Sequence, residues 1–385
     1  MVCTDMSDNG IRQIPFMRLD RQFAAHRTEF LSAMLPVLES GAVLQGPPVA
    51  AFEAKLAAML GARHAVAVGS GTDAMLLAMH ALDLPEGSRV AVPAVTFIAS
   101  AAPILHARCR PVFVDSDPQT GLADEAALLD LVERRAVDAV IVVHLFGQLQ
   151  NLDRIAPAAR EHGIPIIEDS AQALGALRHG AAPGRAGLCA AISFDPMKVI
   201  GAFGSGGALI TDDDDVARVA RQLRYHGDDG KAHYVRPGFN CQMHSLQAAA
   251  LSVKLDQVHT WQSRRRAIAS VLDDALAGTP GLRRMATLPG NLHNDHKYVV
   301  WVDDDRDALR RALADNGVQT KVHYEHPLHR QPLFADFTNG TSCPNADAVS
   351  AHVLSLPMYP ELIDDEVCYV ARAVRQSLGA ACSVG

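Results

Sequence analysis

Short apolar runs alternate with helix-length segments through the first half of the chain, and this alternation constrains the fold more than any other feature. The runs are rich in Val, Ile and Ala, and they lie at Val66, 90–92, 112–114, 140–143, 164–167 and 190–194. Strands that are apolar throughout and separated by helices are typical of a mostly parallel sheet covered on both faces. We therefore predict an α/β fold between residue 64 and about residue 211.

The remainder of the chain predicts a second, smaller unit. A segment without Gly or Pro, from Ser245 to about Ala277, predicts one long helix of the kind that joins two lobes. We expect a large domain over residues 1–250, with an N-terminal helical segment, and a smaller α+β domain over 251–385 that the long helix enters. The other predicted elements are helices at 20–40, 48–60, 306–316 and 364–378 and strands at 298–302 and 318–324.

Composition excludes several classes of function. The net charge of −8 argues against a nucleic-acid partner, because phosphate backbones are bound by dense Lys and Arg. The seven cysteines form no C-x-x-C pair and the seventeen histidines form no H-x-x-x-H or H-E-x-x-H, so we expect reduced thiols and no metal site. No apolar run reaches membrane-spanning length and no signal pattern opens the chain, so we expect a cytoplasmic protein without a membrane partner.

Lys198 is the first candidate for chemistry. It lies between the apolar run 188–192 and the glycine-dense segment 201–207. A lysine in that position is held close to the sheet, where burial lowers its pKa and exposes the neutral amine that reacts with carbonyl groups. Taken alone, the pattern also fits a surface lysine on a turn. Two further motifs favour the chemical interpretation.

Those motifs are an acid at a strand end and a glycine turn before a helix. The run 164–167 continues into Glu168 and Asp169, and ligands of open parallel sheets bind at the carboxyl ends of the strands. An Asp at such a strand end can pair with the protonated ring nitrogen of a bound ligand. The turn 69–72 follows another strand-like run and precedes a helical pattern from Asp73, an arrangement whose free N–H groups favour a bound phosphate.

A phosphate site, an acid at a strand end and a reactive lysine are the parts that a pyridoxal phosphate (PLP) enzyme needs. With these residues the chain resembles the DegT-type (DegT/DnrJ/StrS) nucleotide-sugar aminotransferases, which have the PLP fold-type I, aspartate aminotransferase-like architecture. The resemblance runs from Ile14 to Met358. It rests on seven motifs in matching order: 71–74, 92–97, 144–148, 168–172, 193–198, 246–249 and 323–329.

The resemblance assigns roles residue by residue. Lys198 and Asp169 are the expected catalytic residues. The expected cofactor-binding residues are Gly71, Thr72, Asp73, Phe97, Asp169, Gln172, Ser193, Lys198 and Asn240.

Four of these assignments have a specific meaning in the family. Phe97 matches the aromatic residue that stacks on the pyridine ring, and Gln172 matches a group near the ring hydroxyl. Ser193 matches a phosphate ligand, and Asn240 matches an asparagine that reaches the phosphate from the neighbouring subunit. The resemblance thus implies a homodimer with shared active sites. Without it, Phe97 also fits core packing, and Ser193 and Asn240 also fit turns.

The presence of a lysine at position 198 narrows the reaction. Some relatives carry histidine there and dehydrate their substrate, so the lysine implies transamination, with glutamate as the expected donor and a nucleotide-linked keto-deoxysugar as acceptor. Two alternatives stay open, a PLP-dependent sugar dehydratase or lyase on the same scaffold and a non-catalytic regulator. A nicotinamide enzyme is disfavoured, because the strand-like run 90–92 ends without the acid that would hold a ribose.

The sequence departs from the family pattern on the expected substrate side. Asp195 stands where Tyr or His is common, Val199 stands where Asn is common, and 241–245 replaces a Ser-Arg-Met-Asp-Glu motif. We expect a nearly neutral pocket, with Arg224, Arg236 and several histidines near the substrate.

Overall fold

The computed structural model describes residues 11–338 and 340–381. Its large lobe is built on a seven-stranded sheet in the order β1-β8-β7-β5-β4-β2-β3, in which only β8 runs antiparallel to its neighbours. The mostly parallel α/β fold predicted from the apolar runs is therefore confirmed. The strands are β1 (His64–Val68), β2 (Arg89–Pro93), β3 (Arg110–Val114), β4 (Ala139–Val143), β5 (Ile166–Asp169), β7 (Cys189–Ser193) and β8 (Gly207–Thr211).

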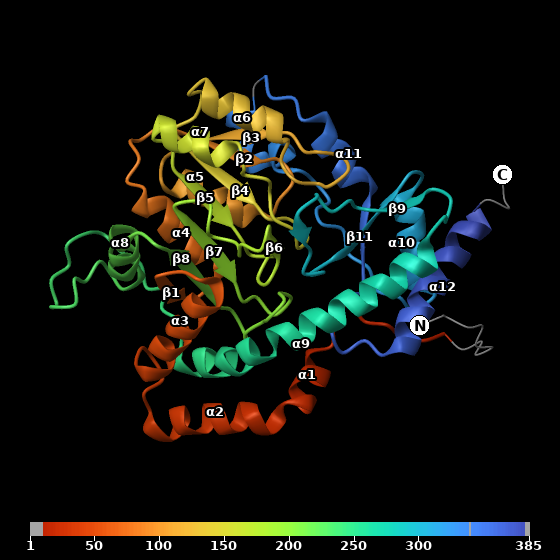
Figure 1. Cartoon of the computed structure of the whole chain (residues 1–385), viewed down its shortest axis with the longest axis horizontal. Coiled ribbons are helices and arrows are strands. Elements are labelled where there is room, and N and C mark those ends of the chain that lie inside the picture. The colour runs from red at the N-terminus through yellow and green to blue at the C-terminus, as the bar shows by residue number, and fades with distance from the viewer. Residues whose placement is uncertain (1–10, 339, 382–385) are drawn as a thin grey trace.

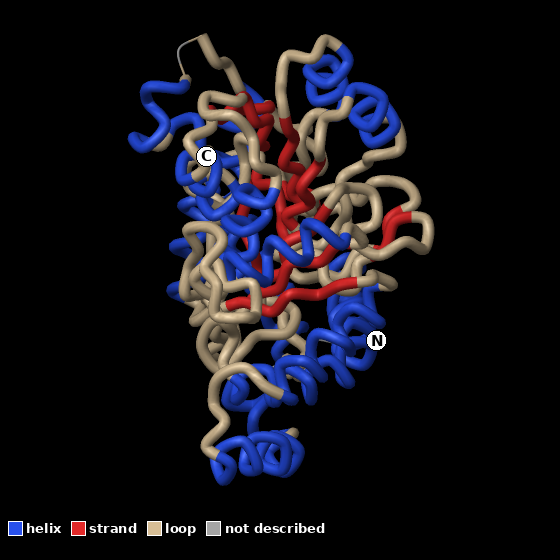
Figure 2. The backbone as a smooth tube through the Cα atoms, turned by 90° about the vertical axis from the view of Figure 1, so that its left-hand side faces the viewer, coloured by secondary structure: helices blue, strands red, loops and turns tan. Residues whose placement is uncertain are grey.

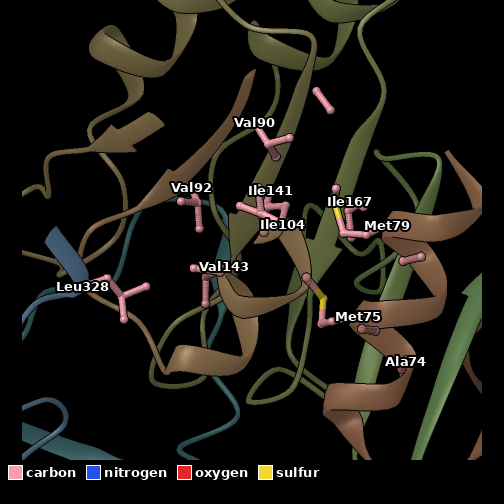
Figure 3. Packing of buried hydrophobic residues seen from close by; sticks show 14 of the residues in the cluster. Ala74, Met75, Met79, Val90, Val92, Ile104, Ile141, Val143, Ile167 and Leu328 are labelled. Carbon is pink, nitrogen blue, oxygen red and sulfur yellow. The ribbon is translucent and has the colours of Figure 1, made fainter. Parts of the chain in front are cut away.

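Helices cover both faces of this sheet because alternate strand residues point to opposite sides. Val66 and Val68 of β1 pack under α4 (Gly71–Ala81) and α8 (Asp214–Arg224), and α5 (Ala102–His106) covers β3 on the same face. Figure 3 shows Met75 and Met79 of α4 directed toward the strands that carry Val143 and Ile167. The opposite face packs against α3 (Pro47–Leu60), α6 (Glu125–Glu133), α7 (Ile155–His162) and the first half of α9 (Ser245–Leu276).

The small lobe is a three-stranded antiparallel sheet in the order β12-β11-β9, with helices packed against it. The second half of α9 shares its core, so this single helix runs along both lobes (Figure 1). Ile14 joins the small lobe's core, whereas Leu328 packs with the large lobe. The elements are β9 (Leu282–Arg284), β11 (Tyr298–Val302), β12 (Val353–Leu356), α10 (Arg306–Asp315) and α12 (Asp364–Ala381).

The remaining elements are short or peripheral. The helical pattern 20–40 forms two helices, because His26 between them has non-helical backbone angles of φ −122° and ψ 26°. Figure 2 shows these helices at the outer edge of the molecule. The peripheral elements are α1 (Leu19–Ala25), α2 (Arg27–Ser40), α11 (Pro344–His352), β6 (Leu177–Arg178), β10 (Asn291–Leu292) and the 3₁₀ turns Ile98–Ser100, Leu328–Arg330 and Pro332–Phe337.

One predicted strand is wrong. The segment 318–324 makes only isolated bridges, Val318 to Ile14 and Lys321 to Ser355, and no continuous ladder. Its last two residues, His323 and Tyr324, instead line the cavity described below. The two rings therefore reflect a place at the cavity and not a strand.

The cysteines differ in part from expectation. Cys109, Cys189, Cys241 and Cys343 are buried free thiols, as predicted. Cys368 on α12 is disulfide-bonded, so the expectation that every thiol is reduced is wrong. The other two, Cys3 and Cys382, lie outside the described residues. Over the described part of the chain, no helix combines the length and apolar character needed to cross a membrane.

Candidate active site

A cavity of about 330 Å³ opens at the carboxyl ends of β5 and β7. The amino end of α4 and the 3₁₀ turn Ile98–Ser100 bound it from the large lobe, and residues next to β11 bound it from the small lobe. Carboxyl ends of parallel strands are the usual ligand sites of such sheets. Seven of the predicted residues line this cavity: Gly71, Thr72, Phe97, Asp169, Gln172, Ser193 and Lys198.

Lys198 lies in the tight loop that follows β7. Its backbone N–H donates to the Asp195 carbonyl at 2.9 Å, and Asp195 Oδ1 accepts from Met197 N, also at 2.9 Å. The Lys198 side chain is half-buried and lines the cavity. Burial lowers its pKa, against the opposing charges of Asp169 and Asp195. Since no residue in the described part of the chain bonds to this amine, it is available to react.

Asp169 is fixed at the end of β5 with its carboxylate toward the cavity. The side chain is buried, and Oδ2 accepts a hydrogen bond from Ser100 Oγ at 2.6 Å while Oδ1 accepts from Ala171 N at 3.1 Å. The Thr96 hydroxyl lies 2.8 Å from the Ser100 hydroxyl. These bonds hold the carboxylate in one orientation, as a partner for a positively charged group in the cavity would require.

Glu168 points to the other face of β5, away from the cavity. It contacts His144 Nε2 at 2.8 Å and accepts from backbone N–H groups of the loop 184–187. Because His144 Nδ1 accepts from Gln150 N at 3.0 Å, the His144 proton is on Nε2 and is donated to Glu168. Burial would raise the pKa of Glu168, but these hydrogen bonds outweigh it and the pKa is lowered. Glu168 therefore organises the loop, and Asp169 faces the ligand space.

The amino end of α4 forms a cradle that suits a phosphate. Ser70 Oγ caps the helix by accepting from Asp73 N at 3.0 Å, which leaves the N–H groups of Gly71 and Thr72 without intrahelical partners. Ser193 lies so close that a Cβ on Gly71 would be 2.6 Å from the Ser193 Cβ. Only glycine fits at that position. The Ser193 hydroxyl, the free N–H groups of Gly71 and Thr72 and the positive end of the helix dipole therefore converge on one small space.

Two predicted cofactor ligands lie outside this cavity. The Asp73 carboxylate accepts from Ser70 Oγ at 2.9 Å, so it braces the helix cap, and burial raises its pKa. Asn240 is exposed, and its side-chain oxygen accepts from Gln242 Nε2 at 3.3 Å. Because Asn240 lies outside the cavity of its own chain, it is compatible with a role in the active site of a second subunit. That role stays a prediction.

Phe97 and Gln172 border the cavity on the side of Tyr324. Gln172 Nε2 donates to Tyr324 Oη at 3.0 Å, and its Oε1 accepts from Phe146 N at 2.9 Å. Phe97 lies 6.0 Å from the Tyr324 ring and is 53% exposed, so core packing does not explain it. Its ring is left available to stack on a planar ligand.

The charged residues that line the cavity differ from those predicted. Arg224 is paired with Glu53 at 2.6 Å and is not among the cavity residues, so its predicted place near the substrate is wrong within this chain. Arg236 also lies outside this chain's cavity, and its predicted role near the substrate stays a prediction. The small lobe instead contributes His296, Lys297 and His323. His323 opens the motif 323–329, whereas His296 and Lys297 lie outside the seven motifs and reach the cavity through the packing of the two lobes.

Comparison with known proteins agrees with this geometry. Residues 25–375 match the model of the DegT/DnrJ/EryC1/StrS aminotransferase family. The chain belongs to this family. It is thus a PLP-dependent aminotransferase of fold type I, as the motifs predicted.

Three relatives illustrate the likeness. This aminotransferase is 35% identical to the pleiotropic regulatory protein of Geobacillus stearothermophilus, over 94% of this chain and 98% of that protein. It is 36% identical to the dTDP-3-amino-3,4,6-trideoxy-alpha-D-glucose transaminase of Streptomyces venezuelae, over 94% and 96% of the two chains. The crystal structure of NtdA from Bacillus subtilis with bound cofactor PMP superposes with a TM-score of 0.87 at 26% identity, over 97% and 87% of the chains.

The residues of the cavity fit PLP. The cradle at Gly71, Thr72 and Ser193 suits its phosphate, Asp169 suits its ring nitrogen, and Lys198 presents an amine to its aldehyde. When bound, PLP supplies an exchangeable aldehyde and a ring that withdraws electrons from the reacting carbon.

Proposed function

We propose that this aminotransferase moves an amino group from glutamate to a nucleotide-linked keto-deoxysugar. The observation that carries the proposal is the juxtaposition of the unpaired Lys198 amine and the fixed Asp169 carboxylate in one cavity beside a phosphate cradle. The Streptomyces venezuelae relative, whose name includes a dTDP-linked amino sugar, supports the acceptor class. Relatives that dehydrate their substrate carry histidine at this position, so the presence of Lys198 supports transamination.

The chain's own groups would share the work as follows. Lys198 Nζ would hold the cofactor and, with its lowered pKa, would accept and return the proton of the reacting carbon. Asp169, fixed by Ser100, keeps a positive charge on the ring nitrogen. Gln172 and Tyr324, bonded to one another, border the face where the ring hydroxyl would lie.

The amino transfer has a direct test. With glutamate and a panel of nucleotide-linked keto sugars, the enzyme should form 2-oxoglutarate and amino sugar in equal amounts, and Lys198→Ala should form neither. Sugar dehydration without 2-oxoglutarate would favour the lyase alternative, and binding without turnover would favour the regulator. Failure of glutamate, glutamine, aspartate and alanine alike would contradict transamination.

We also propose that the enzyme is a homodimer whose active sites are shared. The helix α2 and the residues after it expose an apolar surface, with Leu31, Leu35, Leu38, Val43 and Leu44 between 42% and 56% exposed. Apolar surface of this kind is typical of a contact with another subunit, and two-fold dimers are the commonest assembly. The exposed position of Asn240, outside its own cavity, fits a role in the partner's site.

Mixed dimers test the sharing. Asn240→Asp should weaken cofactor binding, because it sets a negative charge against the phosphate. A heterodimer of Asn240→Asp with Lys198→Ala then contains one site with both changes and one with neither, so activity should return. Two affinity tags would isolate the mixed species for assay. The matched control, Asp169→Asn with Lys198→Ala, leaves one lesion in every site and should stay inactive. An inactive Asn240→Asp mixture would overturn the shared-site proposal.

The domain division and the location stay proposals as well. The small-lobe core, to which the second half of α9 contributes, supports a division into 1–250 and 251–385, although Val299, Val349 and Val353 pack with the large lobe. Four buried free thiols support the reducing cytoplasm, although the disulfide at Cys368 does not.

A further inference from the structure

Lys297 is a buried lysine that the chemistry above does not use. It precedes β11, lines the cavity and is only 6% exposed. Its backbone N–H donates to the Phe146 carbonyl at 3.1 Å, which fixes the residue where the two lobes meet. Its side-chain amine lies 5.0 Å from the centre of the Phe16 ring. Within residues 11–338 and 340–381, no carboxylate pairs with this amine.

The surroundings of Lys297 are short of negative charge. Burial lowers its pKa well below the ordinary value, and the nearby charges of Lys198, Arg265 and Lys321 lower it further, opposed only by Asp195. A buried lysine without a partner is unfavourable in its charged form, and an entering anion would relieve that cost. The position is therefore built for a negatively charged group that the chain does not supply.

His296, the preceding residue, has the same character. It is 2% exposed, lines the cavity, and its Nδ1 atom is buried without a hydrogen-bond partner among the described residues. Buried polar atoms in folded proteins nearly always have partners, so an orphan atom beside a cavity indicates a ligand. Among the described residues, two adjacent and nearly fully buried side chains at the same wall thus lack a partner: no carboxylate pairs with the Lys297 amine, and no hydrogen bond reaches His296 Nδ1.

The phosphate of the cofactor cannot be this ligand, because it has its own cradle at the amino end of α4. A carboxylate matches the Lys297 amine and the His296 ring, because it is a compact anion that accepts hydrogen bonds from an ammonium group and from a ring N–H. Both substrates of a transaminase can carry one. The amino donor always has a carboxylate, and a sugar has one if it is a uronate.

We propose that Lys297, assisted by His296, binds a carboxylate of the substrate beside Lys198. The inference rests on the proposed function for the identity of the substrates, but the contact itself does not depend on turnover. Lys297 would then set a preference for acidic over neutral substrates. Loss of the charge should weaken binding of an acidic ligand about 10- to 100-fold, the range for a hydrogen bond to a charged group.

Calorimetry on the PLP-loaded enzyme can test the contact without catalysis. Glutarate serves as a probe of the donor site, because it carries two carboxylates and no amine. UDP-glucuronate against UDP-glucose probes the sugar site, because the two differ in a single carboxylate. Lys297→Met retains the length and apolar stem of the side chain, and Lys321→Met is the matched control: its amine lies 5.2 Å from the same Phe16 ring, but Lys321 is exposed and outside the cavity.

Each outcome decides the proposal. Weaker glutarate binding in Lys297→Met alone assigns the contact to the donor, and loss of a preference for UDP-glucuronate over UDP-glucose assigns it to the sugar. Equal behaviour of wild type, Lys297→Met and Lys321→Met toward all three probes would overturn it. A wild-type enzyme that binds glutarate through Lys297 but forms no 2-oxoglutarate from glutamate would contradict the proposed function and leave the carboxylate site standing.

Discussion

Lys198→Ala should abolish amino transfer while the protein still folds and binds PLP noncovalently. Two contributions disappear together, the covalent attachment and the proton transfer, and the second alone is worth about 10² to 10⁴ in rate. We expect kcat to fall by more than about 10⁴-fold. Borohydride treatment followed by peptide mass analysis should locate the cofactor on the Lys198 peptide of the wild type.

Two other lysines make this test specific. Lys254 is buried behind the cavity, with its amine bonded to Gln22 Oε1 and the Gly201 carbonyl, both at 2.6 Å. Lys297 lines the cavity itself and also has a lowered pKa. Cofactor found on either of these residues in the wild-type enzyme would refute the assignment of Lys198. The exposed Lys321 provides a control substitution that should leave kcat unchanged.

Asp169→Asn and Glu168→Gln should have opposite effects, although the two acids are adjacent. Asp169→Asn removes a charge facing the cavity, and kcat should fall about 10²- to 10³-fold with little change in Tm. Glu168→Gln weakens a buried hydrogen-bond network, and the free energy of unfolding should fall by about 2 to 4 kcal/mol, with kcat retained in the folded fraction. Steady-state kinetics and thermal unfolding followed by circular dichroism separate the two effects.

The pH dependence of unfolding adds a check on Glu168. Its pKa in the folded protein is lowered from the ordinary value of 4.5. Its contribution to stability is therefore fully present above about pH 4.5 and is lost as the pH falls through the lower, folded value. Wild type should lose stability through that acidic window more steeply than Glu168→Gln. If stability fell equally steeply with pH in the two proteins, the structural role of Glu168 would be contradicted. An inactive Glu168→Gln beside an active Asp169→Asn would mean that the two acids have been assigned the wrong way round.

The large lobe could be predicted because its signals are local. Strands such as β4 are apolar at every position, and each is bounded by a turn or a helix cap, so the alternation is readable without knowledge of the packing. Lys198, Asp169 and Gly71 could be predicted for a related reason: Asp169 ends β5, Lys198 lies in the loop after β7, Gly71 begins α4 after β1, and parallel strands bring their carboxyl ends to one edge.

Two residues of the small lobe, His296 and Lys297, could not be predicted. His296 and Lys297 lie about a hundred residues beyond Lys198 and reach the cavity only because β11 packs beside the large lobe. The error at Arg224 has the same origin, since a charged residue near a motif can equally turn to an internal partner, here Glu53. The strand predicted at 318–324 failed because a segment with Val318, Val322 and Tyr324 spaced among polar residues has the same composition whether it builds a ladder or lines a ligand site.

The position of β5 in the sheet separates a ligand-binding acid from a structural one by a single peptide unit. β5 is paired on both sides, with Asp169 opposite Val143 of β4 and Ala191 of β7. A shift of one residue in this pairing would turn Glu168 to the cavity face of the sheet and Asp169 to the face of the loop 184–187. Both carboxylates would survive such a change, yet each would be in the wrong environment. For this enzyme, the alignment of one four-residue strand is thus as much a determinant of chemistry as the identity of the residues it carries.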